Sequence, residues 1–273
     1  MRAVERPTVL VTGATDGLGR GIAERLAAEG ATVLVHGRDP AKVDAVVEEV
    51  GAAQAFVADL ASLEEVRRLA GEVEGGVEEL HVLVNNAGIG SGMPDGHERR
   101  ESRDGHELRF AVNHLAGFLL ALRLLPLLRR SAPARIVNVA SLGQAPIDFD
   151  DPMIERGYSG ARAYGQSKLA QISTGFELAE RLGAGEVTVT SLHPATYMPT
   201  KIVLEEVGRS VDRLEEGVEA TVRLALSPEL EGATGRFYDG QMETSAHAQA
   251  YDPEARRRLW RLSLALTGAP EPG

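Results

Sequence analysis

The chain has 273 residues, of which 43% are hydrophobic, so it can build a full core, and we expect one domain over 1–273. Its 29 basic and 40 acidic residues give a formal charge of −11, which repels polyanions and argues against nucleic acid or an anionic membrane surface as a main partner. It contains no cysteine, which excludes disulfides, thiolate metal sites and a cysteine nucleophile.

Short valine-rich runs alternate with longer segments of helical period along the whole chain. In chain order the expected elements are strand TVLVTG, a helix at 17–30, strand ATVLVHG, a helix at 40–51, strand AQAFVA, a helix at 62–74, strand LHVLVNN, a helix at 104–130, strand ARIVNVA, a helix at 161–182, strand VTVTSLH, a helix at 213–225 and strand GRFYD. Strands that are apolar on both faces and separated by helices indicate a parallel sheet covered on two sides. The predicted fold class is therefore α/β, a single-domain Rossmann-type doubly wound parallel sheet with helices on both faces.

Two irregular stretches, 143–160 and 195–215, follow predicted strands. In an open α/β sheet the loops that leave the carboxyl ends of the strands form the ligand crevice, so we expect both stretches to be substrate-site loops. Apolar residues in these loops and in 88–103 are candidates for substrate contact, with loop packing as the alternative: Met93, Ile147, Phe149, Tyr197, Met198 and Ile202.

The most apolar segment, GFLLALRLLPLL, contains Arg123 and Pro126, which we expect to break it well short of a membrane span. The opening residues, MRAVERPTVLVTG, have too short an apolar stretch for a signal peptide. These features predict a cytoplasmic protein without a membrane span.

The first predicted strand is followed by TGATDGLG, a glycine-rich turn that opens the first helix. Three glycines fall where a tight turn and close backbone approach are needed, and the helix start offers amide donors and the positive end of a dipole. We expect this turn to hold a diphosphate, although turn glycines without a ligand are the alternative. The residues assigned to cofactor binding here are Gly13, Thr15, Asp16, Gly17, Leu18 and Gly19.

The second strand ends in VLVHGRD, where dinucleotide-binding folds distinguish a ribose hydroxyl from a ribose 2′-phosphate. An acidic residue there would bond the ribose, whereas an arginine accommodates the phosphate. Gly37 occupies the place expected for the acid and Arg38 follows, so the sequence favours NADP over NAD. Asp39 is the competing ribose partner, but its position before Pro40 is typical of a helix cap.

Asp59 and Leu60 follow the third strand and are also assigned to the cofactor site. Asp59 could reach the adenine ring there. A helix-capping role near Ser62 is an equally good interpretation of the same aspartate.

Tyr164 and Lys168 stand four residues apart in AYGQSKLA, within a predicted helix, so their side chains share one helical face. A nearby ammonium favours the ionised form of a phenol, whose unperturbed pKa of about 10 makes it a poor proton shuttle near neutral pH. Tyr164 is therefore a candidate general acid and base. The spacing alone also occurs by chance, so its meaning depends on the other motifs.

The motifs TGxxxGxG at 12–19, NNAG at 85–88, Asn113, Ser141 and YxxxK at 164–168 resemble, in this order, the short-chain dehydrogenase/reductase family. The resemblance runs from about residue 8 to about residue 238. More narrowly, DLASLEEVR, DGHELRFAVNHLAGFLL and AYGQSKLA resemble the retinol-dehydrogenase-like branch, whose members are mostly NADP-linked. The closing segment resembles the tail of that branch, so 250–273 is expected to form a C-terminal helical tail.

The resemblance implies a catalytic tetrad of Asn113, Ser141, Tyr164 and Lys168. Tyr164 would protonate a carbonyl oxygen as hydride arrives from the nicotinamide, and Ser141 would hydrogen-bond the same oxygen. Lys168 would stabilise the phenolate and hold the nicotinamide ribose. Asn113 would hold a water that relays protons through the lysine, and its alternative is a local contact with the helix or backbone.

The resemblance also implies cofactor contacts at the ends of the fourth and sixth strands and from the tyrosine and lysine. The residues concerned are Asn86, Ala87, Gly88, Tyr164, Lys168, Pro194, Thr196 and Thr200. Thr200 matches the family's threonine, with Thr196 as a rival. The family often has Pro-Gly after the sixth strand, whereas Pro194 precedes Ala195 here, and a Cβ narrows the backbone freedom.

Taken together, these residues predict an NADP(H)-dependent oxidoreductase that interconverts a carbonyl and an alcohol on an apolar small molecule. The alternatives are an NADP-binding sensor or interaction module on the same fold, and a lyase or epimerase with transient cofactor use. No metal site is expected, because the seven histidines show no ligand-spaced cluster. The resemblance favours a homodimer or homotetramer, for which helices at 117–130 and 167–182 offer apolar faces unless the sheet buries them.

Overall fold

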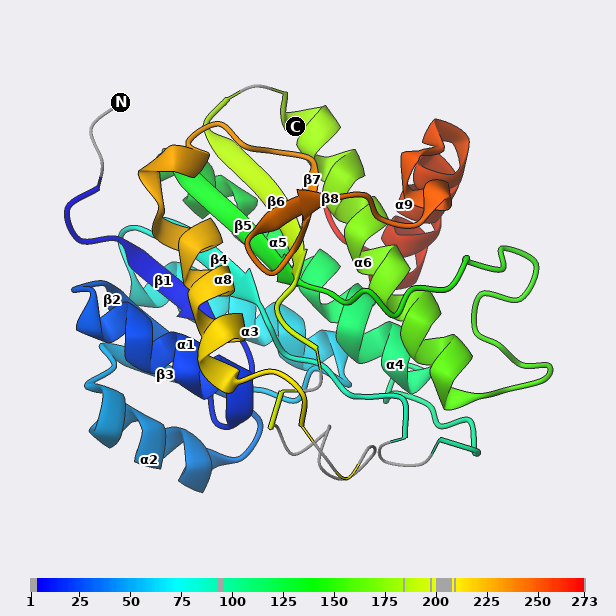
Figure 1. The fold of residues 1–273 in the computed structure, drawn as a ribbon, viewed down its shortest axis with the longest axis horizontal. Helices are drawn as coiled ribbons and strands as arrows, with labels where there is room; N and C mark the ends of the chain where they lie inside the picture. The colour runs from blue at the N-terminus through cyan, green and yellow to red at the C-terminus, as the bar shows by residue number, and fades with distance from the viewer. Residues whose placement is uncertain are drawn as a thin grey trace.

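The computed structural model describes residues 4–92, 96–183, 185–196, 198–199, 208 and 210–272. Within them lies one eight-stranded sheet in the order β3-β2-β1-β4-β5-β6-β7-β8 (Figure 1). The strands are β1 (Thr8–Val11), β2 (Thr32–Gly37), β3 (Gln54–Val57), β4 (Val82–Asn85), β5 (Ala134–Val139), β6 (Val187–His193), β7 (Arg236–Asp239) and β8 (Met242–Thr244). Neighbouring strands from β3 to β7 are parallel, and β8 runs antiparallel to β7.

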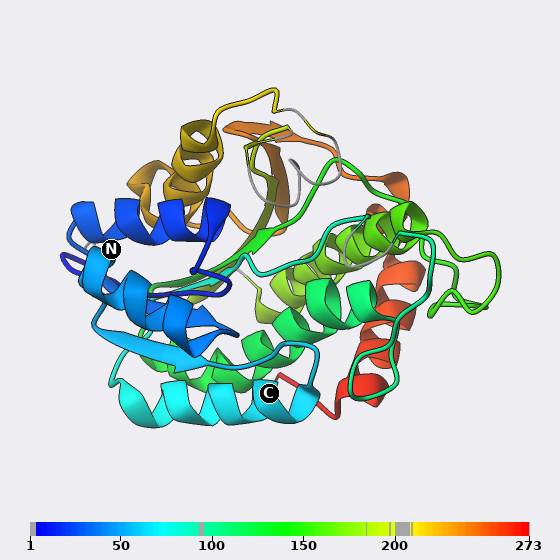
Figure 2. The same cartoon turned by 90° about the horizontal axis from the view of Figure 1, so that it is seen from below.

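Helices cover both faces of this sheet (Figure 2). They are α1 (Gly17–Ala28), α2 (Pro40–Val50), α3 (Leu63–Gly76), α4 (Leu108–Phe110), α5 (Ala116–Arg130), α6 (Gly160–Leu182), α8 (Leu214–Leu226) and α9 (Pro253–Thr267). Along β1, Val9 and Val11 pack into the core beneath α1, α2 and α8, whereas Leu10 packs into the core beneath α3, α5 and α6. This alternation buries both faces of the strand. The predicted doubly wound α/β fold is confirmed.

The strand order reverses between β1 and β4, which are neighbours in the sheet although β2 and β3 come between them in the chain. In doubly wound sheets the ligand crevice lies outside the carboxyl ends of the strands at such a switch point. The segments that leave β1, β4, β5 and β6 therefore share one edge. The glycine-rich turn, the NNAG motif, Ser141 and Pro194 all belong to these segments.

The predicted helix at 104–130 begins four residues later, at Leu108, and includes a π-helical turn (Ala111–Leu115) between α4 and α5. Arg123 and Pro126 lie within this helix, as its predicted bounds imply, and both side chains are exposed whereas its other faces are buried. The expectation that these two residues leave the apolar segment too short for a membrane span is wrong. By length and composition alone, 108–130 could cross a membrane, the one such helix in the described parts of the chain. Its most apolar window is 78% buried inside the protein, as in a core helix.

The apolar faces of α5 and α6 are covered within the chain. α3 packs on α5, and α9 packs on α6. The Trp260 ring of α9 meets the Phe118 ring of α5 at 5.0 Å between centroids, and the guanidinium of Arg181 lies 4.5 Å from the Trp260 ring. These faces are therefore buried within the chain, which was the alternative to pairing between subunits. They give no reason to expect an oligomer. A homodimer or homotetramer stays a prediction.

Candidate active site

The turn between β1 and α1 has room only for glycine at two positions. Gly13 has a φ of +65°, and a Cβ there would lie 2.9 Å from the Cα of Ala87. A Cβ on Gly19 would overlap the carbonyl oxygen of Gly13 and the side-chain amide of Asn86. The absence of side chains lets the turn close on the segment after β4 and leaves the start of α1 accessible to a ligand.

Hydrogen bonds of Thr12 and Asn86 connect this turn to the segment after β4. The hydroxyl of Thr12 accepts hydrogen bonds from the backbone N–H groups of Asn86 and Ala87 at 3.0 and 3.1 Å. The side-chain amide of Asn86 donates to the carbonyl oxygens of Thr12 and Gly13 at 2.9 and 3.2 Å. Asn86 thus acts through its side chain as well as its backbone, and the two cofactor segments form one rigid unit.

The carboxyl end of β2 presents an unpaired cation. Arg38 is exposed, and no hydrogen bond or ion pair within the described residues engages its guanidinium. A Cβ on Gly37 would overlap the methyl group of Thr15, so the glycine turn sits directly against this strand end. Asp39 caps α2, as its alternative interpretation predicted, because its carboxylate accepts from the N–H groups of Ala41 and Lys42. Its oxygens are thereby turned toward the helix.

The carboxylate of Asp59 also contacts other groups of the protein. Its Oδ1 accepts from the N–H of Ala61 at 3.0 Å, and its Oδ2 lies 3.7 Å from the guanidinium of Arg103. Ser62 is the residue that caps α3, accepting from Glu65. Asp59 is therefore not the cap of α3, contrary to the alternative interpretation, although its carboxylate already contacts protein groups. The adenine contact stays a prediction.

Lys168 is buried beneath Tyr164. Its side chain is 5% exposed, and its Nζ lies 5.9 Å from the centre of the tyrosine ring. The ammonium donates to the carbonyl oxygen of Val139 at 2.8 Å and to Oε1 of Gln171 at 3.4 Å. Burial lowers the pKa of Lys168 from 10.5 to about 8. The lysine therefore remains mainly charged at neutral pH while facing little competing water.

Ser141 and Tyr164 meet at Gly143. A Cβ on Gly143 would lie 3.4 Å from the Oγ of Ser141 and 3.7 Å from Cε1 of Tyr164. The Ser141 Oγ accepts from the backbone N–H of Gly143 at 3.0 Å, which orients the hydroxyl and leaves its hydrogen available to a ligand. The end of β5 and the start of α6 thus bring a serine hydroxyl and a phenol to one place.

Asn113 lies in the π-helical turn, a feature that often marks functional sites. Its Oδ1 accepts from the N–H of Ile89 at 2.8 Å, and its Nδ2 donates to the Ile89 carbonyl at 3.0 Å and to the hydroxyl of Ser167 at 3.0 Å. The side chain is therefore engaged by protein groups, but these partners are 24 or more positions away, so they are not the local helix-to-backbone contact given as its alternative. A Cβ on Gly88 would lie 3.2 Å from its Oδ1 and 3.6 Å from the Nζ of Lys168, so Asn113 borders the lysine.

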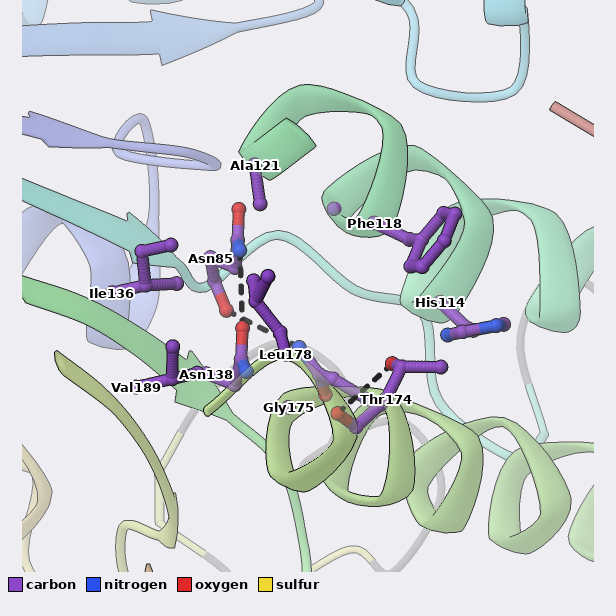
Figure 3. Close-up of a pocket in the computed structure, with 12 residues that line it drawn as sticks. Asn85, His114, Phe118, Ala121, Ile136, Asn138, Thr174, Gly175, Leu178 and Val189 are labelled. Carbon is purple, nitrogen blue, oxygen red and sulfur yellow. Dashed lines mark hydrogen bonds between the residues drawn. The ribbon is translucent and has the colours of Figure 1, made fainter. Parts of the chain in front are cut away.

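A cavity of about 20 Å³, lined by both polar and apolar residues, lies between α5, α6 and strands β4 to β6 (Figure 3). Asn85 donates to Asn138 across two strands at 3.0 Å, and Gln171 connects the Asn85 carbonyl to Lys168. The Oδ1 of Asn85 and the Nδ1 of His114 are buried and have no hydrogen-bond partner within the described structure. The volume suits a single water molecule.

The loop residues expected to contact substrate divide into two groups. Met93, Tyr197 and Ile202 lie outside the described residues, as does Thr200, which was predicted to contact the cofactor. The apolar candidates that are described follow the packing alternative: Ile147 and Met198 are 4% and 7% exposed and belong to the core, and Phe149 lies under the guanidinium of Arg258. Of the cofactor residues after β6, Thr196 holds His193 through its hydroxyl at 3.0 Å, and Pro194 is buried beside it.

A buried ionic cluster that motif reasoning missed joins the segment after β4, at 90–91, to the irregular stretch 143–160. Arg109 is fully buried and donates to the carbonyl oxygens of Gly90 and Ser91 at 2.7 and 2.8 Å, and to the hydroxyl of Tyr158 at 2.6 Å. Tyr158 in turn donates to Glu107, and burial raises its pKa to about 12. Two charged residues only two positions apart, Glu107 and Arg109, within the apolar period of ELRFAV were the signal, because buried charges require partners.

Comparisons with known proteins agree with this arrangement. The family model for short chain dehydrogenases matches residues 7–207. Retinol dehydrogenase 13 of Homo sapiens is 35% identical over 294 residues, covering 97% of this chain and 86% of that protein. The structure of an uncharacterised Mycobacterium paratuberculosis protein has a TM-score of 0.80 at 30% identity, with 100% and 97% of the two chains covered. The Pseudomonas aeruginosa RhlG/NADP active-site complex has a TM-score of 0.71 at 28% identity, with 87% and 95% covered.

The sheet order and the glycine turn at its switch point define a Rossmann-type dinucleotide-binding protein. The chain belongs to the short-chain dehydrogenase family, within its retinol-dehydrogenase-like branch, and it is an NAD(P)-dependent oxidoreductase. The family resemblance predicted from the motifs is confirmed.

Proposed function

We propose that this oxidoreductase uses NADP(H) to interconvert a carbonyl and an alcohol on an apolar small molecule, with Tyr164 as general acid and base. The observation that carries the proposal is the buried Lys168 ammonium, held by the Val139 carbonyl at 2.8 Å and placed 5.9 Å from the Tyr164 ring. A buried positive charge next to a phenol favours the phenolate, which is the form that remains after proton donation.

The residues at the switch point fit a dinucleotide. The bare glycine turn offers backbone amides to a diphosphate, although one of them, on Gly17, already bonds the Asp16 carboxylate at 2.8 Å. The unpaired Arg38 supports the phosphorylated cofactor, because a guanidinium can form paired hydrogen bonds with a phosphate. When bound, the cofactor supplies or accepts the hydride.

In the direction of reduction, the Tyr164 hydroxyl donates its proton to the carbonyl oxygen. Ser141 donates a hydrogen bond to the same oxygen and holds it against the phenol, since its own Oγ is oriented by the Gly143 N–H. The charge of Lys168 stabilises the phenolate that results, and its ammonium would hold the nicotinamide ribose of a bound cofactor. Asn113 fixes the backbone at Ile89 beside the lysine, so its side chain supports the site, and the water relay that the family resemblance implies for it stays a prediction.

An apolar substrate is supported by the surroundings of the serine. Leu142, the residue after Ser141, is 45% exposed, which offers an apolar side chain next to the serine. The name of the relative retinol dehydrogenase 13 indicates an apolar alcohol as that protein's substrate. We therefore extend the proposal to apolar aldehydes and ketones, with 143–160 and 195–215 as the loops around them.

The test is NADPH oxidation with a panel of aldehydes and ketones that runs from glyceraldehyde to long-chain aldehydes and retinal. Turnover that rises with the apolar surface of the carbonyl compound is expected. Binding of NADPH without turnover across the panel would favour the alternative of a sensor or interaction module. Nucleotide that stays bound through purification without exchange would favour a lyase or epimerase.

Arg38→Ala is expected to raise the Kd for NADPH by about tenfold or more, because it removes a charged contact to the 2′-phosphate. The Kd for NADH should change by less than about threefold. Fluorescence titration of both nucleotides measures this. Arg236→Ala, which makes the same charge change on β7 in an exposed ion pair with Glu243, is the control and should leave both Kd values unchanged. Equal loss for both nucleotides in Arg38→Ala would contradict the assignment.

The proposal includes a cytoplasmic enzyme without a membrane span. Its support is the 78% burial of the most apolar window of 108–130, the helix that passes the length and composition test in the described chain. Flotation with phosphatidylcholine vesicles should leave the protein in the soluble fraction.

A further inference from the structure

His36 lies in β2, two residues before Arg38, and its side chain is 2% exposed. Its Nδ1 accepts a hydrogen bond from the backbone N–H of Gly13 at 3.2 Å. Since Nδ1 is an acceptor, the proton of the neutral ring is on Nε2, which donates to the carbonyl oxygen of Ala58 at 3.1 Å. One imidazole therefore joins the glycine turn after β1 to the segment after β3.

The two imidazole hydrogen bonds connect β1, β2 and β3 beyond the last backbone hydrogen bonds between these strands. The last backbone bonds between the same segments run from the Ala14 N–H to the His36 carbonyl at 2.8 Å and from the Ala58 N–H to the Gly37 carbonyl at 3.0 Å. Gly13 has already turned into a left-handed conformation, so its N–H relies on the imidazole. Burial lowers the pKa of His36 to about 4, which keeps the ring neutral and Nδ1 an acceptor near neutral pH.

We propose that His36 is a positioning residue for the dinucleotide. It holds the glycine turn, which would contact the diphosphate, and the segment from Ala58 to Leu60, which would contact the adenosine, in one arrangement before the cofactor binds. The inference rests on the proposed NADP(H) site. Without the ring acceptor, the part-buried Gly13 N–H loses its hydrogen-bond partner, and the turn must be ordered by the ligand instead, which lowers affinity.

The effect should fall on cofactor affinity and not on the chemical step, because His36 lies at the adenosine end of the expected site and Tyr164 at the other. His36→Phe keeps a buried ring but can neither accept nor donate. It is expected to raise the Kd for NADPH by about tenfold or more. The kcat at saturating NADPH should remain within about threefold of the wild type. His36→Asn, whose amide oxygen can replace Nδ1 as the acceptor, should recover most of the affinity.

His81 provides a matched control at the opposite edge of the sheet. Its Nδ1 accepts from the N–H of Thr8 at 3.0 Å, at the amino end of β1, and the side chain is 5% exposed. His81→Phe removes the same kind of bond without touching the glycine turn. It should lower Tm but leave the Kd for NADPH unchanged.

The experiment measures NADPH affinity of the full chain by fluorescence titration and Tm by calorimetry. Equal Kd values for the wild type and His36→Phe would overturn the inference, as would an equal rise in His81→Phe. If His36→Phe does not fold, His36→Gln replaces it, since its longer amide can reach Ala58 but leaves Gly13 unpaired. It should bind NADPH more weakly than His36→Asn, and equal affinities would overturn the inference. A wild type that binds no NADPH would instead contradict the proposed function.

Discussion

Replacing Tyr164 with phenylalanine is expected to lower kcat by about 10²–10⁴-fold, the range typical for loss of a positioned general acid. The Kd for NADPH should stay within about threefold, because the change removes one hydroxyl and leaves the ring above Lys168. Single-turnover oxidation of saturating NADPH by an apolar aldehyde measures the loss. It separates proton transfer from product release.

Tyr251→Phe is the control for this variant. Tyr251 is 47% exposed, and its hydroxyl accepts from the N–H of Ala246, away from the switch point. Its removal should leave turnover unchanged. A Tyr164→Phe enzyme that retains more than about a tenth of the wild-type kcat would show that another group supplies the proton.

Lys168→Met is expected to abolish turnover and yet stabilise the fold. The charged lysine is buried, and removing the charge while keeping an unbranched chain should raise the free energy of unfolding at pH 7 by roughly 1–3 kcal/mol. The lost hydrogen bond to the Val139 carbonyl offsets part of the gain. Urea unfolding at pH 7 measures the difference. An exposed control, Lys42→Met, should change it by less than about 0.5 kcal/mol.

The stability difference should also depend on pH. Because the pKa of Lys168 is lowered on folding, from 10.5 to about 8, the unfolded chain binds more protons between these values. The wild type therefore gains stability as pH rises from 8 to 10.5. The advantage of Lys168→Met is full below pH 8 and should have largely disappeared at pH 10. A variant that is less stable than the wild type at pH 7, or that remains active, would contradict the role given to this lysine.

Much of the fold was predictable because each element carries a local signal. Alternating valine-rich runs and helical periods indicate the parallel strands, and caps such as Asp39 and Ser62 mark where helices begin. β8 was missed, since it has three exposed residues and no apolar period. Its pairing with β7 depends on a tight reversal after Asp239 more than on pattern.

The helix at 108–130 shows where local signals fail. Arg123 and Pro126 looked like breaks in an apolar run, but both side chains face solvent and the surrounding packing supports the helix through them. Its start was misjudged by four residues, because Glu107 turns its carboxylate onto the N–H of Phe110 and begins the helix there. Tertiary burial overrides the cost of an interior proline in this case.

Some residues of the candidate site could likewise be predicted from the sequence, and others could not. The glycines and the tyrosine–lysine pair follow from spacing, since steric limits and helical period act over a few residues. Contacts between residues distant in sequence do not follow from spacing. Examples are the Asn113 bonds to Ile89, the Arg109 cluster and the His36 bridge, each of which joins segments 18 or more positions apart. Such contacts are set by how the layers pack. Met198 looked like a substrate residue for the same reason, although it fills the space between α1 and α8.

The central claim is hydride transfer between NADP(H) and an apolar carbonyl compound. The measurement that tests it most directly uses NADPH deuterated at both positions of nicotinamide C4, with retinal and a long-chain aldehyde as acceptors and mass spectrometry of the products. The account predicts an alcohol that carries one deuterium on its carbinol carbon for each NADPH oxidised. NADPH that binds but delivers no deuterium to either aldehyde would contradict it.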